Sequence, residues 1–413
     1  MKCSWLAILL AVASVELAAA PTRAQCGGIC VYENGSPDLG RGAAGAGARA
    51  QDASTAFWNP AGMTELEGHE VLIGLAGSFG ALDPDLDSGT TTRDPAPVSG
   101  GNASGFSPLF GGYYAAELPF GIHFGLASTA LYGGSVDYEN DWTGRNYVVD
   151  ASLVALLIQP SFAYAVTDWL SLGGGPAILY TSYEQSVRVV LLRQEPTAEI
   201  KDADDWSVGG TVSALLKPFD GTRIGVYYRT EIEADTSGHV ESPPGVDLDI
   251  DTDFTFPQGV NVSLFQQITD DWAVLADVGW TDWSEFSNIP IQIGGVAGTQ
   301  DRGWRDTWRV GAGVQFTPSS VWTLQTGFGY DSSPVRSKRL LPDIPASEQY
   351  RFSAGVQVRP TDYVEISASY QFLWFRDLEF ERVSLPPATG VVLNGSYERS
   401  WANQVGVSLR VRF

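Results

Sequence analysis

The sequence between Val364 and Trp374, VEISASYQFLW, decides the class of fold. Apolar and polar side chains alternate along it, with Val364, Ile366, Ala368, Tyr370, Phe372 and Trp374 in one set and Glu365, Ser367, Ser369 and Gln371 in the other. Successive side chains of a β-strand point to opposite faces of the sheet. The stretch therefore predicts a strand with one apolar face and one polar face.

The same alternation recurs along most of the chain, for example in 304–316, 322–330 and 405–413. We place strands near residues 74, 114, 126, 158, 176, 210, 228, 262, 277, 310, 325, 352, 368 and 406. A soluble β-sandwich also shows such alternation. The segments here are about ten residues or longer, however, which is the length of a tilted membrane-spanning strand. Fourteen strands is also an even number, as in bacterial outer-membrane barrels.

Short turns and long loops alternate in register with these strands. Short turns lie at 118–121, 166–169, 217–222, 269–272, 317–321 and 359–363, and long polar loops lie near 81–109, 133–150, 184–204, 236–255, 284–303, 333–346 and 377–396. Fourteen strands need this arrangement when both chain ends are periplasmic. We therefore predict an all-β fold, a 14-stranded antiparallel transmembrane barrel that occupies residues 69–413.

The composition agrees with this prediction and excludes several functions. The 413 residues include 46 Gly, 13 Trp, 16 Tyr and 19 Phe, but only 3 His and 3 Cys. The net charge of −23 excludes a general binder of nucleic acid, which needs basic side chains for the phosphates. With so few metal-binding side chains, we expect no metal and no cofactor. We also expect no catalytic residues.

The N-terminus predicts export from the cytoplasm. Met1 and Lys2 precede an apolar stretch at 5–15 and a group of small residues, which is the pattern of a secretory signal peptide. We place the cleavage near residue 24 and assign residues 1–24 to the signal peptide. Cys26 and Cys30 follow, and in an oxidising compartment they could form a small disulfide loop. Free thiols or part of a metal site are the alternatives.

Residues 25–68 lack the alternation and are rich in glycine and alanine, so we expect a compact plug, or hatch, inside the barrel. The run at 52–63, DASTAFWNPAGM, resembles the hatch motif of the FadL-type transporters, which carry long-chain fatty acids and hydrocarbons across Gram-negative outer membranes. Further motifs follow in the family's order at 256–259, 280–286, 305–309, 329–335 and 341–343. The resemblance covers residues 31–413.

The resemblance implies uptake of hydrophobic compounds at the outer membrane. Long-chain fatty acids are the expected cargo, and neutral aromatic or aliphatic hydrocarbons are the alternative. The family's route is capture at the outer loops, rearrangement of the hatch and lateral exit through the barrel wall. The resemblance assigns the gating role to Asn59, Pro60, Ala61 and Gly62, and it places the first three at the hatch end nearest the ligand pocket.

The resemblance also implies a kink in the third strand and basic side chains for the ligand carboxylate. The pair Gly133 and Gly134 matches the kink, because glycine lets a strand bend, although the pair could simply begin an outer loop. The candidate ligand-binding residues are Arg188, Arg302 and Arg305. These arginines could equally be loop charges that pair with nearby acidic residues.

The chain ends on Phe413, which resembles the end that the barrel assembly machinery recognises. We expect a monomer that contacts outer-membrane lipid and lipopolysaccharide and binds a hydrophobic small molecule. The alternative functional classes are a barrel enzyme such as an outer-membrane lipase, and an open porin or adhesin.

Two groups of polar residues could suggest a metal but do not have the required spacing. Four carboxylates alternate at Asp247, Asp249, Asp251 and Asp253, without the glycine and glutamate of a calcium-binding loop. We interpret them as a solvated loop face. The three histidines at 69, 123 and 239 are far apart in the sequence.

Overall fold

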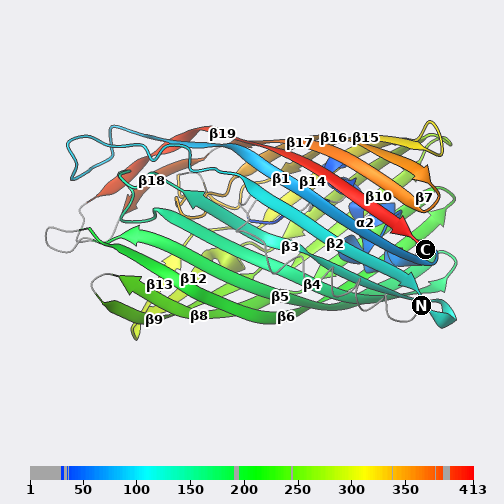
Figure 1. Ribbon diagram of the computed structural model, residues 1–413, viewed down its shortest axis with the longest axis horizontal. Helices are drawn as coiled ribbons and strands as arrows, with labels where there is room; N and C mark the ends of the chain where they lie inside the picture. Colours follow the sequence, from blue (N-terminus) through cyan, green and yellow to red (C-terminus); the bar gives the residue numbers. More distant parts are fainter. Residues whose placement is uncertain are drawn as a thin grey trace.

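The computed structural model describes residues 29–31, 35, 37–189, 195–242, 245–336, 338–376, 378–384 and 391–413. The predicted signal peptide and Cys26 lie outside the described residues. Within the described chain, nineteen strands form one closed antiparallel sheet, a barrel whose strands are tilted to its long axis (Figure 1). The strands are β1 His69–Leu86, β2 Ser107–Glu117, β3 Ile122–Asp137, β4 Asp150–Thr167, β5 Leu170–Arg188, β6 Thr197–Phe219, β7 Thr222–Arg229, β8 Ile232–Ser242, β9 Val246–Phe256, β10 Gly259–Gln267, β11 Trp272–Thr281, β12 Asn288–Ile293, β13 Val296–Asp301, β14 Thr307–Phe316, β15 Trp322–Asp331, β16 Glu348–Thr361, β17 Val364–Arg376, β18 Glu379–Ser384 and β19 Val392–Arg412.

When strands that continue one another across a short break are counted together, the barrel has fourteen transmembrane strands. This confirms the predicted architecture. Five of the nineteen strands, β8, β9, β12, β13 and β18, continue neighbouring strands β7, β10, β11, β14 and β17 beyond a short break. β1 pairs with both β2 and β19, and this closes the barrel. At the seam, the His69 N–H donates to the Phe413 carbonyl at 3.2 Å and the Phe413 N–H donates back at 3.0 Å.

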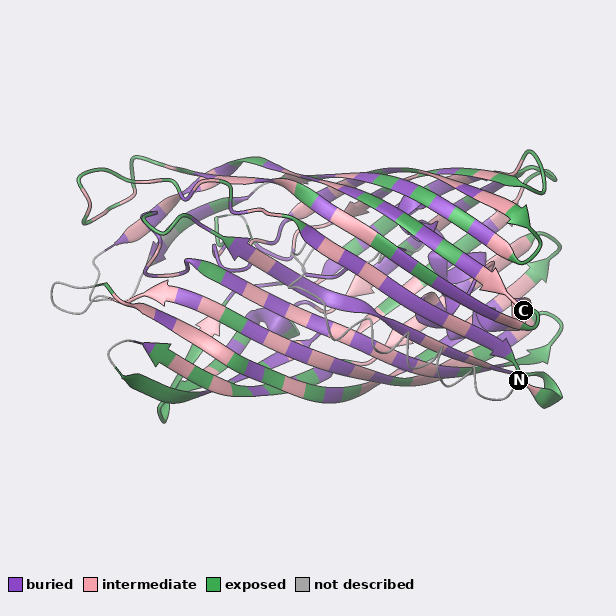
Figure 2. Ribbon diagram, in the orientation of Figure 1, coloured by how far each residue is buried: buried purple, intermediate pink, exposed green. Residues whose placement is uncertain are grey.

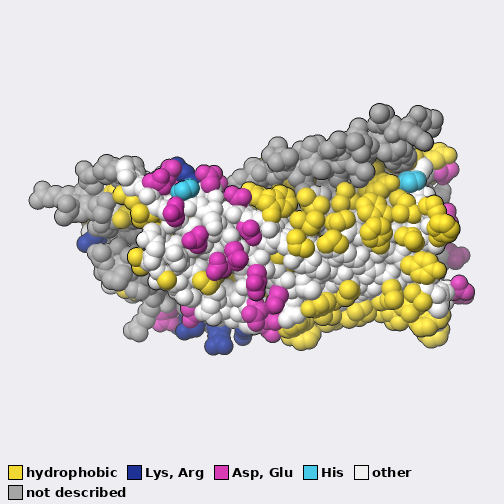
Figure 3. Space-filling model, turned by 90° about the horizontal axis from the view of Figure 1, so that it is seen from below, with side chains coloured by type: hydrophobic (Ala, Val, Ile, Leu, Met, Phe, Trp, Pro, Cys, Tyr) yellow, Lys and Arg dark blue, Asp and Glu magenta, His cyan; other side chains and the backbone are white. Residues whose placement is uncertain are grey.

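The side chains of the wall point as the alternation predicts. On β17, Ile366, Tyr370 and Trp374 are exposed on the outer surface, whereas Glu365 and Gln371 are buried. The same banding runs along most strands (Figure 2). In the view of Figure 3, apolar side chains cover the half of the barrel nearer the C-terminus, and acidic side chains gather over the opposite half. An apolar outer band of this kind is what the lipid interior requires.

Two of the predicted long loops are instead hairpins, so their prediction as loops was wrong. Residues 236–255 lie mostly in β8 and β9, which pair along their whole length, and residues 284–303 contain β12 and β13. Polar alternation in these segments marks strands that extend beyond the apolar band, where water replaces lipid. The side chains of Asp247, Asp249, Asp251 and Asp253 are exposed on one face of β9, as a solvated face requires.

The hatch fills the barrel near the end that carries the C-terminus (Figure 1). It consists of short helices, η2 Pro37–Arg41, α2 Ala46–Arg49, α3 Thr55–Trp58 and η3 Pro60–Glu65. Two further single turns, η4 Pro119–Gly121 and η5 Glu285–Ser287, lie in the wall connections. None of the helices in the described part of the chain is long and apolar enough to cross a membrane.

Glycines in the wall allow the hatch backbone to approach it closely. A Cβ atom at Gly225 would collide with the carbonyl oxygen of Gly47, and a Cβ atom at Gly327 would collide with the carbonyl oxygen of Arg41. Glycine is required at such points because any side chain would hold the two backbones apart. These contacts fix where the hatch lies against the wall.

Buried ion pairs also hold the hatch in place. Arg309 on β14 contacts Asp277 on β11 at 3.0 Å, and this carboxylate accepts a hydrogen bond from the Gly45 N–H at 3.0 Å. Near the C-terminal end, Glu70 accepts from the Ala53 N–H at 2.5 Å and contacts Arg410 at 2.6 Å. The hatch is thus bonded to the wall at two levels through charged groups that burial makes costly to separate.

Candidate functional site

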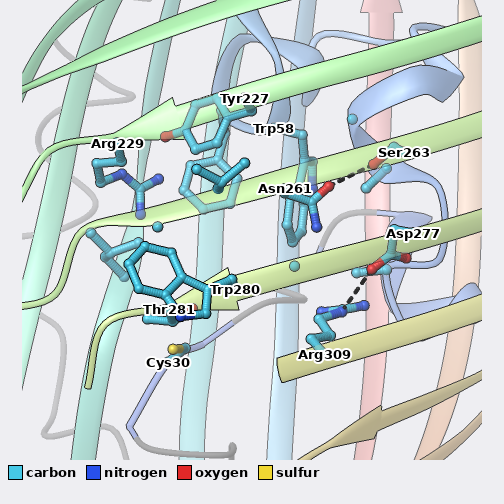
Figure 4. Close-up of a pocket in the computed structure, with 18 of the residues that line it drawn as sticks. Cys30, Trp58, Tyr227, Arg229, Asn261, Ser263, Asp277, Trp280, Thr281 and Arg309 are labelled. Carbon is cyan, nitrogen blue, oxygen red and sulfur yellow. Dashed lines mark hydrogen bonds and ion pairs between the residues drawn. The ribbon is translucent and has the colours of Figure 1, made fainter. Parts of the chain in front are cut away.

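An apolar cavity lies between the hatch and the wall, with a volume of about 100 Å³. The hatch contributes Phe57 and Trp58, and the wall contributes Tyr132, Tyr227 and Trp280 among others. Figure 4 shows Trp58, Tyr227 and Trp280 around the space, together with charged groups at its edges. Aromatic walls with few polar groups are typical of sites for hydrophobic ligands.

A cluster of buried aromatic rings adjoins the cavity at the level where the wall strands break. Phe256 stacks on Tyr132 with ring centres 4.9 Å apart, and Trp283 contacts Phe286 at 5.6 Å and Trp304 at 5.2 Å. The alternation over 304–316 puts Trp304 on the same face as the exposed Trp308, and this was wrong. Trp304 is only 6% exposed, because β14 begins only at residue 307 and Trp304 instead forms an isolated bridge with Val335. The alternation applies only within a continuous strand.

The wall opens between β2 and β3 beside this cavity. The two strands pair from Glu117/His123 only as far as Gly111/Thr129, although β3 continues to Asp137. The register of β3 against β4 shifts between Ala130 and Tyr132. An extra residue of this kind is a β-bulge, which bends its strand.

The bulge is not at the glycines that the sequence suggested for the kink. Gly133 and Gly134 pair regularly with Val154 and Leu153 on β4. The irregularity begins earlier, at Leu131, because an extra residue rather than a glycine breaks the ladder. The irregularity of β3 therefore lies two or three residues before this pair, and the role of Gly133 and Gly134 as a lateral-opening kink stays a prediction.

Residues 29–31, which we call the N-terminal strap, occupy the edge of β3 that β2 leaves free. The Val31 N–H donates to the Leu131 carbonyl at 2.9 Å, and the Gly133 N–H donates to the Ile29 carbonyl at 2.8 Å. The strap also contributes Cys30 to the lining of the cavity. It is therefore part of both the cavity and the wall. Because Cys26 lies outside the described residues, its disulfide with Cys30 stays a prediction.

On the other side of the hatch lies a polar vestibule of about 540 Å³. Five arginines and five carboxylates line it among the described residues, including Arg223, Arg359 and Glu365. The hatch residues Arg49, Ala50 and Gln51 form its inner end, and residues of the short turns surround its mouth. Such a space suits water and is unfavourable for an apolar molecule.

The hatch motif holds the hatch to the wall and does not line the cavity, so its predicted place beside the pocket was wrong. The Asn59 amide donates to the Gly47 carbonyl at 2.7 Å and to the Ala214 carbonyl of β6 at 3.0 Å. The Ala61 N–H contacts Ser213 on the same strand at 3.0 Å. Pro60 and Gly62 are buried in the same turn. These polar groups are fully used in anchoring, and the aromatic residues just before them face the cavity instead.

The three arginines proposed as ligand-binding residues lie away from the cavity. Arg188 donates to Thr197 at 2.8 Å and to Asn140 at 2.9 Å among the outer loops. Arg305 is exposed and donates to the Ser333 carbonyl at 3.2 Å. None of the three lines the cavity, so their binding role stays a prediction without support from this geometry.

Arg302 forms a buried, bidentate ion pair with Asp343, at 2.6 and 3.2 Å, which joins two outer loops. Burial alone would lower the pKa of Arg302, but the attraction and hydrogen bonds of Asp343 outweigh it and raise the pKa. The pair therefore stays charged and holds the outer loops together. Its geometry makes a loop-bonding role the simpler interpretation of Arg302.

The Arg302→Met variant is expected to loosen these loops strongly. It leaves the Asp343 carboxylate buried without its cation, which costs about 3–5 kcal/mol. Amide hydrogen exchange at residues 341–346 should accelerate about a hundredfold or more. Adding Asp343→Leu removes the orphan charge and should restore most of the protection. Equal exchange in the single variant and the wild type would contradict the bonding role.

Two arginines line the cavity, Arg229 and Arg309, and the sequence did not single out Arg229. Arg229, at the end of β7, lines the cavity, and its guanidinium lies 5.5 Å from the ring centre of Phe57. The alternation offers a signal for it, because Arg229 shares a parity with Gly225, which faces the hatch. Period two therefore places Arg229 on the lumen side of its strand.

Comparisons with known proteins agree with this architecture. The model of the family described as "Outer membrane protein transport protein (OMPP1/FadL/TodX)" matches residues 17–413. A long-chain fatty acid transport protein of Escherichia coli O6:H1 is 24% identical over 86% of this chain and 89% of its own length. Outer membrane protein P1 of Haemophilus influenzae is 22% identical over 91% and 93% of the two chains.

Two solved structures have the same fold. A FadL homologue of Pseudomonas aeruginosa superposes with a TM-score of 0.84 at 21% identity, and covers 94% of this chain and 100% of that one. The Ralstonia pickettii toluene transporter TbuX gives 0.65 at 18% identity, with 92% and 99% covered. With the family model matching almost the whole chain, this outer-membrane barrel belongs to the OMPP1/FadL/TodX family of transport proteins.

Proposed function

We propose that the protein takes up hydrophobic small molecules across the outer membrane of a Gram-negative bacterium, with long-chain fatty acids as its main cargo. The observation that carries this proposal is the apolar cavity between the hatch and the open β2–β3 edge. Relatives described as long-chain fatty acid transport proteins support the choice of cargo. The likeness to a toluene transporter keeps neutral hydrocarbons as the second candidate.

The small size of the cavity supports a hatch that moves during transport. An apolar cavity of roughly 150 Å³ holds one benzene molecule, and this one has about 100 Å³, which is far too little for a long acyl chain. A long acyl chain can enter only if Phe57 and Trp58 move with the hatch. The motif Asn59–Gly62 then acts as the anchor whose bonds to β6 set the closed position.

We infer that cargo leaves sideways through the wall, not downward. The charged vestibule below the hatch disfavours an apolar molecule. Such a molecule would displace the water around the charged side chains or separate the ion pairs, and both are unfavourable. The β2–β3 edge beside the cavity is closed by the strap, through two backbone hydrogen bonds. Releasing the strap would connect the cavity with the lipid side of the wall.

We infer the remaining partners from the same architecture. The exposed apolar band supports contact with outer-membrane lipid, and we infer that the acidic half contacts lipopolysaccharide. The Phe413 end of β19 fits recognition by the barrel assembly machinery. We also infer that the protein acts as a monomer and as a transporter, not as an enzyme, in line with relatives that are transport proteins.

The test is uptake by cells that lack their own transporter of this family. Cells that make this protein should take up labelled oleate faster than cells with the empty vector. Mass spectrometry of an extract of the purified barrel should find fatty acids. Uptake of labelled toluene but not oleate would favour the hydrocarbon alternative. Uptake of neither compound would refute the proposed function.

A further inference from the structure

A row of charged side chains crosses the outer surface of the wall where β16, β17, β19 and β1 lie side by side (Figure 1). Glu348 on β16 pairs with Arg376 on β17, and Asp83 on β1 pairs with Arg399 on β19. Arg376 shares its face of β17 with the exposed Trp374, so it points away from the lumen. The side chain of Arg399 is exposed as well.

The two arginines of this row lie directly opposite each other. β17 and β19 pair Trp374 with Trp401, and four residues farther along the Tyr397 N–H donates to the Leu378 carbonyl at 3.0 Å. Both contacts belong to one register, which places the two arginines opposite each other between them. Side chains in this position have Cβ atoms about 4.5–5.5 Å apart. The two guanidinium groups can therefore reach the same bound group.

The row lies at the outer end of the apolar band. Tyr370, Trp374 and Val405 are exposed on the same face, on the side of the row nearer the C-terminus. The Arg376 guanidinium lies 5.8 Å from the ring centre of Trp374. Tryptophan and tyrosine are typical of the boundary between acyl chains and head groups. The arginines therefore face the head groups of the outer leaflet.

The carboxylates of the row neutralise the arginines only in part. Arg376 lies 4.0 Å from Glu348, and Arg399 lies 2.5 Å from Asp83 with its side chain 72% exposed. Exposed ion pairs of this kind are weak. Both carboxylates lie on the far sides of the arginines, on β16 and β1. Like charges opposite each other destabilise a sheet, so an anion between the arginines would stabilise this part of the wall.

We propose that Arg376 and Arg399 together bind a phosphate group of lipopolysaccharide on the outer surface of the barrel. The guanidinium fork matches the oxygens of a phosphate, and the acyl chains of the same molecule would lie on the apolar band below. The chain has 48 acidic against 25 basic side chains, and an acidic surface alone would repel phosphates. The inference goes beyond the proposed function, because it concerns the lipid around the barrel and not the cargo.

The test measures binding of deep-rough lipopolysaccharide to the purified barrel in detergent by native mass spectrometry. The same lipid after removal of its phosphates is compared, and a chelator prevents carboxylates from holding phosphate through a divalent cation. Arg376 and Arg399 are both changed to Gln in one variant and both to Lys in another. The matched control, Arg93→Gln with Lys201→Gln, removes the same charge from other outer segments. Heat-modifiable migration on gels shows whether each barrel is folded.

The double glutamine variant should bind the lipid about ten- to hundredfold more weakly, whereas the control should stay within about twofold of the wild type. The double lysine variant should bind with intermediate affinity, because it keeps the charge without the fork. Equal binding of both forms of the lipid by the wild type, or no loss in the double glutamine variant, would overturn the proposal. Phosphatidylglycerol bound as tightly as lipopolysaccharide would overturn the choice of lipid.

Discussion

Planar bilayers with the Gly225→Val, Gly327→Val double variant are expected to carry a steady ionic current, whereas wild-type protein should carry little. The hatch fills the lumen because its backbone lies directly on these two wall glycines. A valine at either position must push the hatch away by more than an ångström, since backbone atoms cannot yield as a side-chain end can. Two such collisions on different strands should unseat the hatch and open a water path about tenfold or more conductive than the closed state.

Gly210→Val is the control for this experiment. Gly210 also lies in a wall strand, but the nearest atom to a Cβ there is 3.9 Å away. The control should keep the low conductance of the wild type while adding a similar apolar group. The valines at 225 and 327 collide with the hatch and should leave the hydrogen bonds between the wall strands unchanged. Heat-modifiable migration on gels should therefore show folded barrels for all variants. A double variant with wild-type conductance would refute the role of these contacts.

The wall could be predicted from the sequence because membrane strands follow a simple local rule. One face of the wall contacts lipid and the other faces a polar lumen, so apolar and polar residues must alternate along every continuous strand. The rule failed where strands break, as at Trp304, because irregular backbone outside a strand does not keep side chains on alternating faces. The bulge at Leu131 could not be read from the sequence either, since a bulge depends on an extra residue and on the partner strand, not on residue type.

The cavity was harder to predict because it joins segments that are far apart in the chain. Its lining comes from the strap, the hatch, β3, β7, β10, β11 and β14. The family motif indicated the hatch correctly, yet the residues that face the cavity are Phe57 and Trp58, just before the motif's proline. Arg229 was within reach of the period-two argument, which places it with Arg223, Gly225 and Tyr227 toward the lumen. Its contact with the Phe57 ring of the hatch, in contrast, is visible only in three dimensions.

A disulfide between the strap and β3 is expected to stop transport until it is reduced. Cys30 and Tyr132 face each other as a bridged antiparallel pair. The hydrogen bonds run between their neighbours, from Val31 to Leu131 and from Gly133 to Ile29. Cys30 and Tyr132 therefore form a non-hydrogen-bonded pair, in which the two side chains lie close together. Tyr132→Cys should thus bring two sulfur atoms within the distance of a disulfide bond. Cys26→Ser is included to leave Cys30 a single partner.

If cargo leaves through the β2–β3 edge, the strap must separate from β3 in every transport cycle. Oxidised Cys26→Ser, Tyr132→Cys protein should therefore lose nearly all oleate uptake, and a reducing agent should restore it in the same cells. The reduced state is the internal control, because it carries the same change in the cavity lining. Equal uptake before and after reduction, with the disulfide shown by mass spectrometry, would mean that the strap can stay in place. Cargo would then have to pass the hatch toward the charged vestibule, against the cost of bringing an apolar chain among paired ions.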